Sequence, residues 1–295
     1  MVTAPSCSRW RGRKAGARMS ILVFGKTGQV ACELQRLHPE FTYLSRKEAD
    51  LLNPDICAEA ILAAKPSAVI NAAAYTAVDL AEDEESLAYT INAEAPAAMA
   101  QACANLGVPF VHISTDYVFD GSGEMSRAPD APTAPINAYG RTKLAGEEAI
   151  RSSGALHAIL RTSWVFSAHG NNFVKTMLRL SETRDSLSIV SDQIGGPTPA
   201  SAIAAACITL AQNLDESGTF HISGAPSVGW AEFAREIFAQ TNRSVTVTDI
   251  PTKDYPTPAA RPLNSRLDCA SLLSDFGVKQ PQWKDELAKV ISELT

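Results

Sequence analysis

The sequence predicts an α/β protein with a doubly wound parallel sheet of the Rossmann-like kind and a smaller C-terminal α/β lobe. The first observation is an apolar run at residues 20–24 that ends at Gly25 and leads into a helical pattern at 29–37. This arrangement is typical of a strand buried on both faces and followed by a helix. The second observation is that further apolar runs alternate with helical stretches, which favours right-handed crossovers between parallel strands.

The remaining elements follow from the same periodicities. Strands are predicted at residues 41–44, 68–71, 109–114, 157–161 and 187–190, and helices at 55–64, 86–106 and 172–184. Beyond residue 192 the pattern changes to helices at 200–213 and 230–241, short strands near Phe220 and Val245, and a proline-rich loop at 251–262. We therefore expect a dinucleotide-binding domain at 19–191 and a substrate-binding lobe at 192–295, with the two lobes interleaved.

Composition narrows the class of protein. The 295 residues are 45% apolar and 20% charged, and no apolar run approaches the length of a membrane span. The net charge is −6, although residues 1–18 carry only basic charges, so the remainder is more acidic than the total. An acidic body argues against nucleic acid as a partner.

Residues 1–18 lack an apolar segment of signal-peptide length, and Met19 directly precedes the first strand. We expect a disordered basic extension with no role in the fold. The six cysteines are scattered without a Cys-x-x-Cys pair, which favours reduced thiols in a cytoplasmic protein. The five histidines are equally dispersed, so no catalytic metal is predicted.

A glycine turn follows the first strand. Gly25 and Gly28 allow a tight turn and close backbone approach before the helix, whose N-terminal amides favour an anion. A P-loop would need a glycine where Ser20 stands inside the strand, so that motif is excluded. The dinucleotide-binding fingerprint fits, with Ala31 at its third glycine position.

The ends of the next two strands bear on the cofactor. Ser45 and Arg46 stand where an NAD-selective site usually has an acid, which favours NADPH, although Arg46 is equally compatible with a solvated surface cation. Ala72, Ala73 and Ala74 follow the third strand and leave room for a cofactor beside the backbone.

Tyr139 and Lys143 lie four residues apart, so on a helix they share one face. A cation one turn away lowers the pKa of a phenol, which would make Tyr139 a candidate general acid, although this spacing is also common on surface helices. Thr115 directly follows the fourth strand upstream, where its hydroxyl can either bind a substrate carbonyl or simply close the strand. Trp164 follows the fifth strand and can serve either as core or as a stacking surface for a base or sugar.

Several of these motifs resemble the dTDP-4-dehydrorhamnose reductases, a family within the extended short-chain dehydrogenase/reductases. They are the segments 24–30, 71–79, 114–121, 192–198 and 261–265, and the similarity spans residues 19–295. The resemblance implies reduction of the C4 ketone of dTDP-4-dehydro-L-rhamnose to dTDP-L-rhamnose, a precursor of cell-surface polysaccharide. The cofactor is expected to be NADPH, with NADH as the alternative.

The resemblance also implies roles for individual residues. The expected catalytic residues are Thr115, Tyr139 and Lys143, and the expected substrate contacts are Thr115, Asp116, Tyr117, Trp164 and Arg261. The expected cofactor contacts, including those argued above, are Gly25, Thr27, Gly28, Gln29, Val30, Ser45, Arg46, Asp50, Leu51, Ala72, Ala73, Ala74, Tyr75, Tyr139 and Lys143. Some members bind Mg²⁺ at a dimer contact through an acid matching Glu33, but the sequence identifies no further ligands. The chain is expected to be a monomer or a homodimer.

Two alternatives stay open. A sugar-nucleotide epimerase or dehydratase would share the fold, but a dehydratase needs an Asp-Glu pair after its catalytic threonine, and here Asp116 and Tyr117 follow Thr115. A non-catalytic binding subunit like the regulatory β subunit of methionine adenosyltransferase would also share the fold. The intact set of Thr115, Tyr139 and Lys143 weighs against it.

Overall fold

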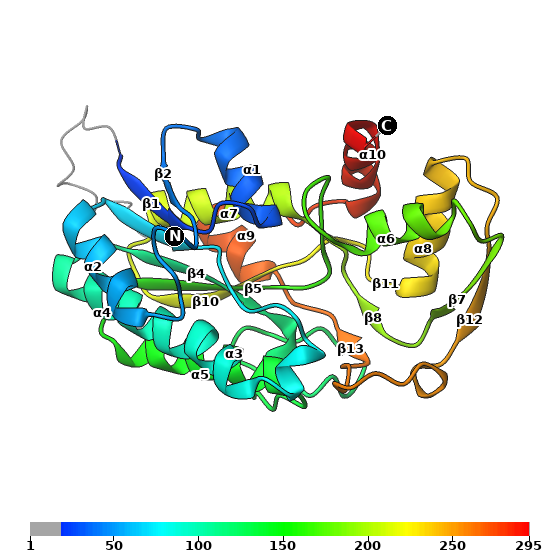
Figure 1. Cartoon of the computed structure of the whole chain (residues 1–295), viewed down its shortest axis with the longest axis horizontal. Helices are drawn as coiled ribbons and strands as arrows, with labels where there is room; N and C mark the ends of the chain where they lie inside the picture. Colours follow the sequence, from blue (N-terminus) through cyan, green and yellow to red (C-terminus); the bar gives the residue numbers. More distant parts are fainter. Residues whose placement is uncertain (1–18, 295) are drawn as a thin grey trace, which may run out of the picture.

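The computed structural model describes residues 19–294, so the predicted basic extension at 1–18 lies outside the described residues. Within the described part, six parallel strands form the main sheet in the order β10-β5-β4-β3-β1-β2 (Figure 1). Their bounds are β1 Ile21–Phe24, β2 Thr42–Leu44, β3 Ala68–Asn71, β4 Phe110–Thr115, β5 His157–Thr162 and β10 Gly218–Ile222. The strand order reverses between β1 and β3, which is where ligands bind in doubly wound sheets.

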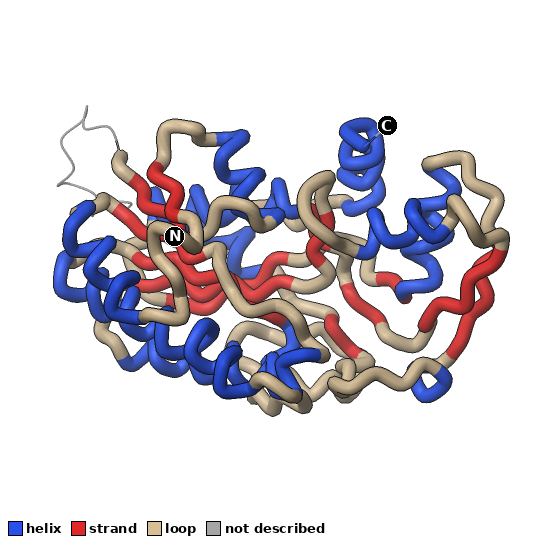
Figure 2. Tube along the Cα trace, viewed as in Figure 1, coloured by secondary structure: helices blue, strands red, loops and turns tan. Residues whose placement is uncertain are grey.

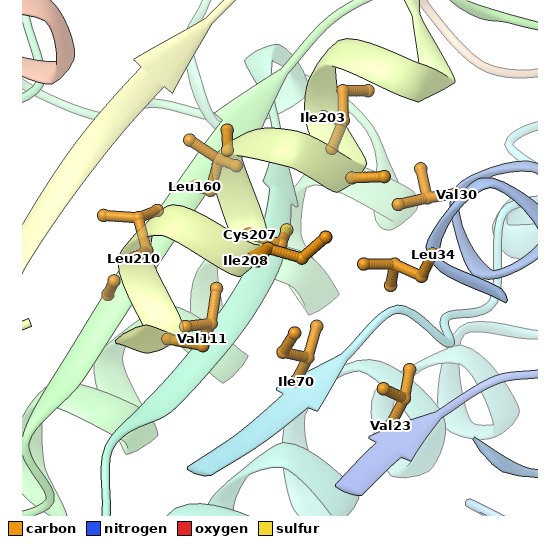
Figure 3. Close-up of a cluster of buried hydrophobic side chains, with 14 of the residues drawn as sticks. Val23, Val30, Leu34, Ile70, Val111, Leu160, Ile203, Cys207, Ile208 and Leu210 are labelled. Carbon is orange, nitrogen blue, oxygen red and sulfur yellow. The ribbon is translucent and has the colours of Figure 1, made fainter. Parts of the chain in front are cut away.

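Helices cover both faces of this sheet, so the predicted fold class is confirmed. Figures 1 and 2 show α1 (Gln29–Leu37), α7 (Ala200–Asn213) and α9 (Ala270–Phe276) on one face. The opposite face carries α2 (Pro54–Ala64), α4 (Ala95–Leu106) and α5 (Ala138–Ser152). Figure 3 shows one of the resulting apolar layers, in which strand residues such as Val23, Ile70 and Val111 pack against Leu34 and Ile203 from the helices. Burial of these apolar side chains is the main stabilising contribution.

The helix predicted at 86–106 is interrupted. It consists of α3 (Glu85–Tyr89), a π-helical turn η2 (Thr90–Glu94) and α4. Pro96 near the start of α4 has no N–H to bond back to the preceding turn, and such a loss favours a local π-bulge. Asn92 lies in this π-helical turn, and its side chain bonds to the backbone of Tyr75. It accepts from the Tyr75 amide (2.9 Å) and donates to the Tyr75 carbonyl (3.1 Å).

The predicted sixth strand at 187–190 is wrongly placed in the main sheet. It belongs to β7 (Ser186–Val190), which pairs with β12 (Thr246–Ile250) in a separate two-stranded sheet. Side chains of β7 alternate between exposed Ser186 or Ser188 and buried Leu187, and this pattern suits a sheet that is buried on one face only. The sixth place in the main sheet is taken by β10, which comes after residue 192.

The smaller lobe is built around its own apolar cluster. Helices α6 (Phe173–Leu180), α8 (Trp230–Gln240) and α10 (Trp283–Leu294) surround it together with β7. The helix predicted at 172–184 ends early, at Leu180, where the Ser181 hydroxyl bonds back to the Leu178 carbonyl. Because α7 and β10 return to the main sheet, residue 192 does not divide the chain into two contiguous units.

Short strands join the two lobes. A three-stranded sheet contains β8 (Ile194–Gly195), β11 (Val228–Gly229) and β13 (Asn264–Ser265), while β6 (Val165–Phe166) pairs with β9 (Thr198–Pro199). The described chain also contains three short 3₁₀ turns, η1 (Leu80–Glu82), η3 (Asp116–Val118) and η4 (Thr252–Asp254). Among the described residues, the five cysteines are unpaired, and no helix is long and apolar enough to cross a membrane.

A buried ion pair ties α5 to the sheet. The Arg161 guanidinium on β5 donates to both carboxylate oxygens of Glu147 on α5, at 2.9 and 2.6 Å, and the two side chains are 2% and 0% exposed. Ser114 on β4 donates to the same carboxylate at 2.6 Å. Burial alone would raise the pKa of Glu147, but the hydrogen bonds and charges of its partners hold that pKa below its ordinary value.

Removing the buried cation should therefore be costly. Arg161→Met leaves Glu147 as an uncompensated buried charge, and we expect urea denaturation to show a loss of about 3–5 kcal/mol in the free energy of unfolding. Arg151→Met is the matched control, because Arg151 contacts the same carboxylate from a position that is 37% exposed. Its loss should be about 1 kcal/mol or less. Equal losses of unfolding free energy in the two variants would contradict the conclusion that the buried pair of Arg161 and Glu147 holds α5 on the sheet.

Candidate active site

The turn after β1 lies where the strand order reverses, which is the place at which doubly wound sheets bind ligands. Gly25 follows β1 with φ +108°, and its amide donates to the Leu44 carbonyl at the end of β2 (3.0 Å). A Cβ on Gly25 would lie 3.3 Å from the backbone of Ala72, which follows β3. Both the positive φ and this close approach favour glycine, so the turn can bring a ligand against the backbone.

The start of α1 directly follows this turn. Gly28 is its N-cap and offers no side chain to the first amides, and Thr27 and Gly28 are exposed. Gln29 is turned elsewhere, since its Oε1 accepts from Ser167 and Asn172 at 3.0 Å each. Two predicted cofactor contacts, Val30 and Leu51, are buried in the apolar layers and offer a cofactor little more than their backbone.

The end of β2 contains an acid that the sequence analysis did not use. Glu48 accepts from the Ser45 amide at 2.7 Å, and this hydrogen bond lowers the pKa of its carboxyl. Arg46 is exposed and donates to Asp50 at 3.1 Å. Arg46, the residue predicted to favour NADPH, is therefore paired with the Asp50 carboxylate, and solvent screens both charges.

At the end of β3 the backbone is held by polar side chains. Asn71 accepts from the Ala73 amide (3.1 Å), and the backbone of Tyr75 is fixed by Asn92. The Tyr75 hydroxyl donates to Glu84 at 2.6 Å, and this bond raises the pKa of the phenol to about 12. Ala72, Ala73 and Ala74 remain partly exposed beside Gly25, as a ligand-lining segment requires.

The structure brings the three predicted catalytic residues together. Thr115 ends β4, and its hydroxyl accepts from the Tyr117 amide at 3.2 Å, which starts the turn η3. Tyr139 and Lys143 lie one turn apart on α5, whose N-cap Asn137 accepts from the Gly140 amide at 2.7 Å. The rings of Tyr117 and Tyr139 meet edge to face at 5.5 Å.

The sequence predicts that Lys143 lowers the pKa of Tyr139, and this prediction is wrong for this structure. Burial raises the pKa of Tyr139 above its ordinary value, opposed by a hydrogen bond with Thr115 and assisted by the charge of Asp116. The Nζ atom of Lys143 is turned toward β4 instead, where it lies 3.0 Å from His112 Nε2 and donates to the Ile113 carbonyl at 2.8 Å. Tyr139 is therefore protonated in this state, which is the form that a general acid needs.

Lys143 is itself unusual because its side chain is almost fully buried. Burial disfavours the ammonium form and lowers its pKa to about 8, while the charge of Glu147 one turn further along α5 opposes the shift. His112 is also buried, and burial followed by the charge of Lys143 puts the pKa of its imidazole well below the ordinary value.

Asp116 is a buried carboxyl beside the tyrosines. Burial raises its pKa to about 6, against hydrogen bonds with Ser265 and Thr115 that lower it. Ser265 lies in β13, so the second lobe reaches the catalytic residues through this contact. A Cβ on neighbouring Gly195 would lie 3.1 Å from Ser265 and 2.8 Å from the Trp164 ring, which places Trp164 at the edge of the same site.

Trp164 adopts φ +49°, and its ring stacks on Trp230 at 3.5 Å with an interplanar angle of 11°. The Trp230 indole donates to Gln193 at 3.2 Å. The sequence is compatible with Trp164 either in the core or as a stacking surface. Trp164 is partly exposed, and Trp230 covers one face of its ring. A ligand could therefore contact only the other face or the edge of the ring.

Arg261 closes another side of the site. Its guanidinium donates to Asp79 at 2.8 Å, and Asp79 also accepts from the Ala259 amide at 3.2 Å. Burial and the charge of Asp116 raise the pKa of Tyr117, and the charge of Arg261 opposes this shift. The proline-rich loop is thereby fastened to the segment after β3, with a cation beside Tyr117.

His112, Glu147 and Trp230 were missed by the sequence analysis. Two of them had a visible signal, because His112 interrupts an apolar strand and Glu147 continues the Tyr139 and Lys143 face of the helix. Trp230 had none, since its contact with Trp164 depends on how the two lobes meet.

Glu33, the residue matched to a Mg²⁺ ligand, lies within a cluster that includes His169 and Glu293. Glu33 is paired with Arg36 at 2.8 Å, and the His169 ring lies 3.7 Å from its other oxygen. Glu33 and Glu293 offer the oxygen ligands that Mg²⁺ prefers, whereas the His169 imidazole and the competing Arg36 guanidinium do not suit it.

Comparison with known proteins gives consistent results. The RmlD substrate binding domain family matches residues 19–295. dTDP-4-dehydrorhamnose reductases from Sinorhizobium fredii and Escherichia coli are 43% and 40% identical, over 94% of this chain and 98% of each relative. A dTDP-4-dehydrorhamnose reductase structure from Bacillus anthracis, in complex with NADP, is 36% identical with a TM-score of 0.89, over 94% of this chain and 100% of that one. The corresponding structure from Clostridium acetobutylicum is 37% identical with the same TM-score, over 94% and 99%.

The raised pKa of Asp116 predicts how stability depends on pH. The folded protein binds this proton up to about pH 6, whereas an unfolded aspartate releases it near pH 4, so the wild type loses stability as pH rises between these values. Asp116→Asn removes this loss. We expect urea denaturation to show a more stable variant above about pH 6, by up to about 3 kcal/mol, and no difference below about pH 4.

Asp120→Asn is the control of opposite sign. Hydrogen bonds from Ser122 lower the pKa of Asp120, so its charged form stabilises the fold and the amide should be neutral or destabilising at pH 7. A less stable Asp116→Asn variant at pH 7 would contradict the predicted burial cost.

Proposed function

The chain belongs to the dTDP-4-dehydrorhamnose reductase family, and we propose that it reduces the C4 ketone of dTDP-4-dehydro-L-rhamnose to the alcohol of dTDP-L-rhamnose. The observation that carries the proposal is the placement of Thr115, Tyr139 and Lys143 around the carboxyl end of β4, where Thr115 hydrogen-bonds Tyr139 and Lys143 bonds to the Ile113 carbonyl. The product is a precursor of cell-surface polysaccharide, and we place the activity in the cytoplasm. Every proposed site residue comes from one chain, so either a monomer or a homodimer is compatible with it.

NADPH, when bound, supplies the hydride that reduces the ketone. Gly25, the first turn of α1 and the segment 72–75 would hold the dinucleotide, with Ser45 and Arg46 at the end of β2 near its adenosine ribose. The preference for NADPH over NADH is supported by Arg46 and by the NADP complex of the Bacillus anthracis relative. No step of the reaction is assigned to a metal.

Tyr139 donates the proton that the developing alkoxide requires. Its raised pKa keeps the Tyr139 phenol protonated at neutral pH. The Thr115 hydroxyl hydrogen-bonds the carbonyl oxygen of the substrate and orients it for this proton transfer. Lys143 holds the ribose hydroxyls next to the nicotinamide, and its charge stabilises the phenolate that forms. The ammonium has three N–H groups, and its contacts with His112 and the Ile113 carbonyl leave one of them for the cofactor.

The substrate lies against the second lobe in this proposal. Tyr117 and Trp164 contact the sugar, while Asp116 binds it from the end of β4. Arg261 offers a cation to the diphosphate once its pairing with Asp79 is relaxed or shared. These residues come from both lobes, so substrate binding favours one relative position of the lobes.

The activity is tested by following NADPH and NADH oxidation with dTDP-4-dehydro-L-rhamnose and identifying the product. We expect stoichiometric NADPH consumption and dTDP-L-rhamnose. Tightly retained NAD⁺ with no net consumption would point instead to an epimerase or dehydratase on the same fold.

Tyr139→Phe removes the transferable proton and keeps the ring. We expect kcat to fall by about 10²–10⁴-fold, while the midpoint of thermal unfolding and the affinity for NADPH hardly change. Tyr89→Phe is the matched control, because Tyr89 is an exposed tyrosine on α3. Wild-type turnover by a folded Tyr139→Phe variant would remove Tyr139 from the mechanism.

A further inference from the structure

We propose that Asn71 and His112 form a buried hydrogen-bond relay that sets the position and the protonation state of Lys143 and links both to the backbone amide of Ala73. Both are positioning residues, acting through Lys143. The proposal deepens the proposed function, because it takes from it the role of Lys143 and the cofactor-lining segment after β3.

The relay is continuous from the end of β3 to α5. His112 lies on β4 and is fully buried, with Nε2 3.0 Å from Lys143 Nζ and Nδ1 3.1 Å from Asn71 Nδ2. Asn71 is also fully buried, and its Oδ1 accepts from the Ala73 amide at 3.1 Å. Lys143 has a second partner in the Ile113 carbonyl, to which it donates at 2.8 Å.

Counting donors and acceptors fixes the proton positions. The Asn71 oxygen is engaged by Ala73, so its amide nitrogen donates to His112 Nδ1, and Nδ1 must accept. A neutral imidazole that accepts at Nδ1 carries its proton on Nε2. That N–H points at Lys143, which can accept a hydrogen bond only as the neutral amine.

The ammonium form of Lys143 requires the opposite arrangement. Nε2 of His112 must then accept, so the ring proton moves to Nδ1, where it faces Asn71. This contact is satisfied only if the Asn71 amide turns over and presents its oxygen, and then the Ala73 N–H loses its acceptor. Protonation of Lys143 is therefore linked to release of the Ala73 N–H, which can then donate to another acceptor.

The charged surroundings make this switch accessible. The titratable groups that face Lys143 are His112 from β4 and Glu147 from its own helix, and Glu147 is neutralised by Arg161 and Arg151. Burial followed by the charge of Lys143 keeps the pKa of His112 far below neutral, so the imidazole changes tautomer without gaining charge. Burial brings the pKa of Lys143 to about 8, within the range of ordinary solution experiments.

The linkage has a consequence for cofactor binding. Ala73 lies in the segment that we propose to line the cofactor, next to the Gly25 turn. A cofactor group that accepts from the Ala73 amide frees Asn71 to turn over, and so favours the ammonium form of Lys143. By reciprocity, protonation of Lys143 favours cofactor binding, so NADPH should bind with uptake of a proton near pH 8.

Nitrogen-15 NMR of histidine-labelled protein tests the relay without any turnover. We expect His112 to carry its proton on Nε2 above about pH 9 and on Nδ1 below about pH 7, with a transition near the pKa of Lys143. The signal is assigned by its loss in His112→Gln. In Lys143→Met the transition should disappear. A His112 tautomer that stays the same from about pH 6 to 10 in the wild type would overturn the proposal.

Calorimetric titration of NADPH in buffers of different ionisation enthalpy measures the coupled proton. We expect uptake of a proton near pH 8 in the wild type and its loss in His112→Phe, which keeps a ring and removes both nitrogens. His157→Phe is the matched control, because His157 is a buried histidine at the start of β5 that bonds to the Ala155 carbonyl and not to Lys143. Equal proton uptake in all three proteins would refute the link.

His112→Gln serves if the Phe variant does not fold. Its amide oxygen can accept from the ammonium near the place of Nε2, so the pKa of Lys143 should rise and the alkaline limb of kcat should move up by ~1 pH unit. An unshifted limb would count against the relay. A tautomer switch in a protein without reductase activity would support the relay and sink the proposed function alone.

Discussion

The site depends on how α5 sits on β4 and β5. This helix buries Lys143 and Glu147 on one face, and two charges cannot be taken out of water unless each finds partners. Arg161 and Ser114 satisfy the carboxylate, and His112 with the Ile113 carbonyl satisfies the amine. Because these partners come from fixed positions on two adjacent strands, the helix has one low-energy placement, and Tyr139 is held at the end of β4 as a result.

Burial acts in opposite directions on the two residues of the Tyr-x-x-x-Lys pair. It disfavours the charged form of each, so it raises the pKa of Tyr139 and lowers that of Lys143. The resting site therefore holds a protonated acid and an amine that is readily neutralised. The charged forms that the reaction needs, the Lys143 ammonium and the Tyr139 phenolate, are therefore favoured only when cofactor and substrate are bound.

The second lobe completes the site through contacts that are distant in sequence. Ser265 reaches Asp116, Arg261 pairs with Asp79, and Trp230 covers one face of Trp164. Close backbone packing enforces this arrangement, because a Cβ on Gly121 would overlap Pro262 at 2.4 Å. The Arg261 contact joins two side chains that are 17% and 42% exposed, so solvent reaches it more readily than the pair of Arg161 and Glu147.

The sequence by itself determined the parallel sheet and the glycine turn, because these follow from local periodicity and from a short motif with a mechanical reason. It also placed Tyr139 and Lys143 one turn apart on a helix and Thr115 at the end of the preceding strand, which makes them candidate catalytic residues. It did not determine that β10 completes the sheet, since strand order depends on long-range pairing. It also misjudged the pKa of Tyr139, because spacing on a helix reports a nearby cation but not the direction in which that cation points. Only the tertiary structure, which surrounds Lys143 with β4, decided that its partner is His112.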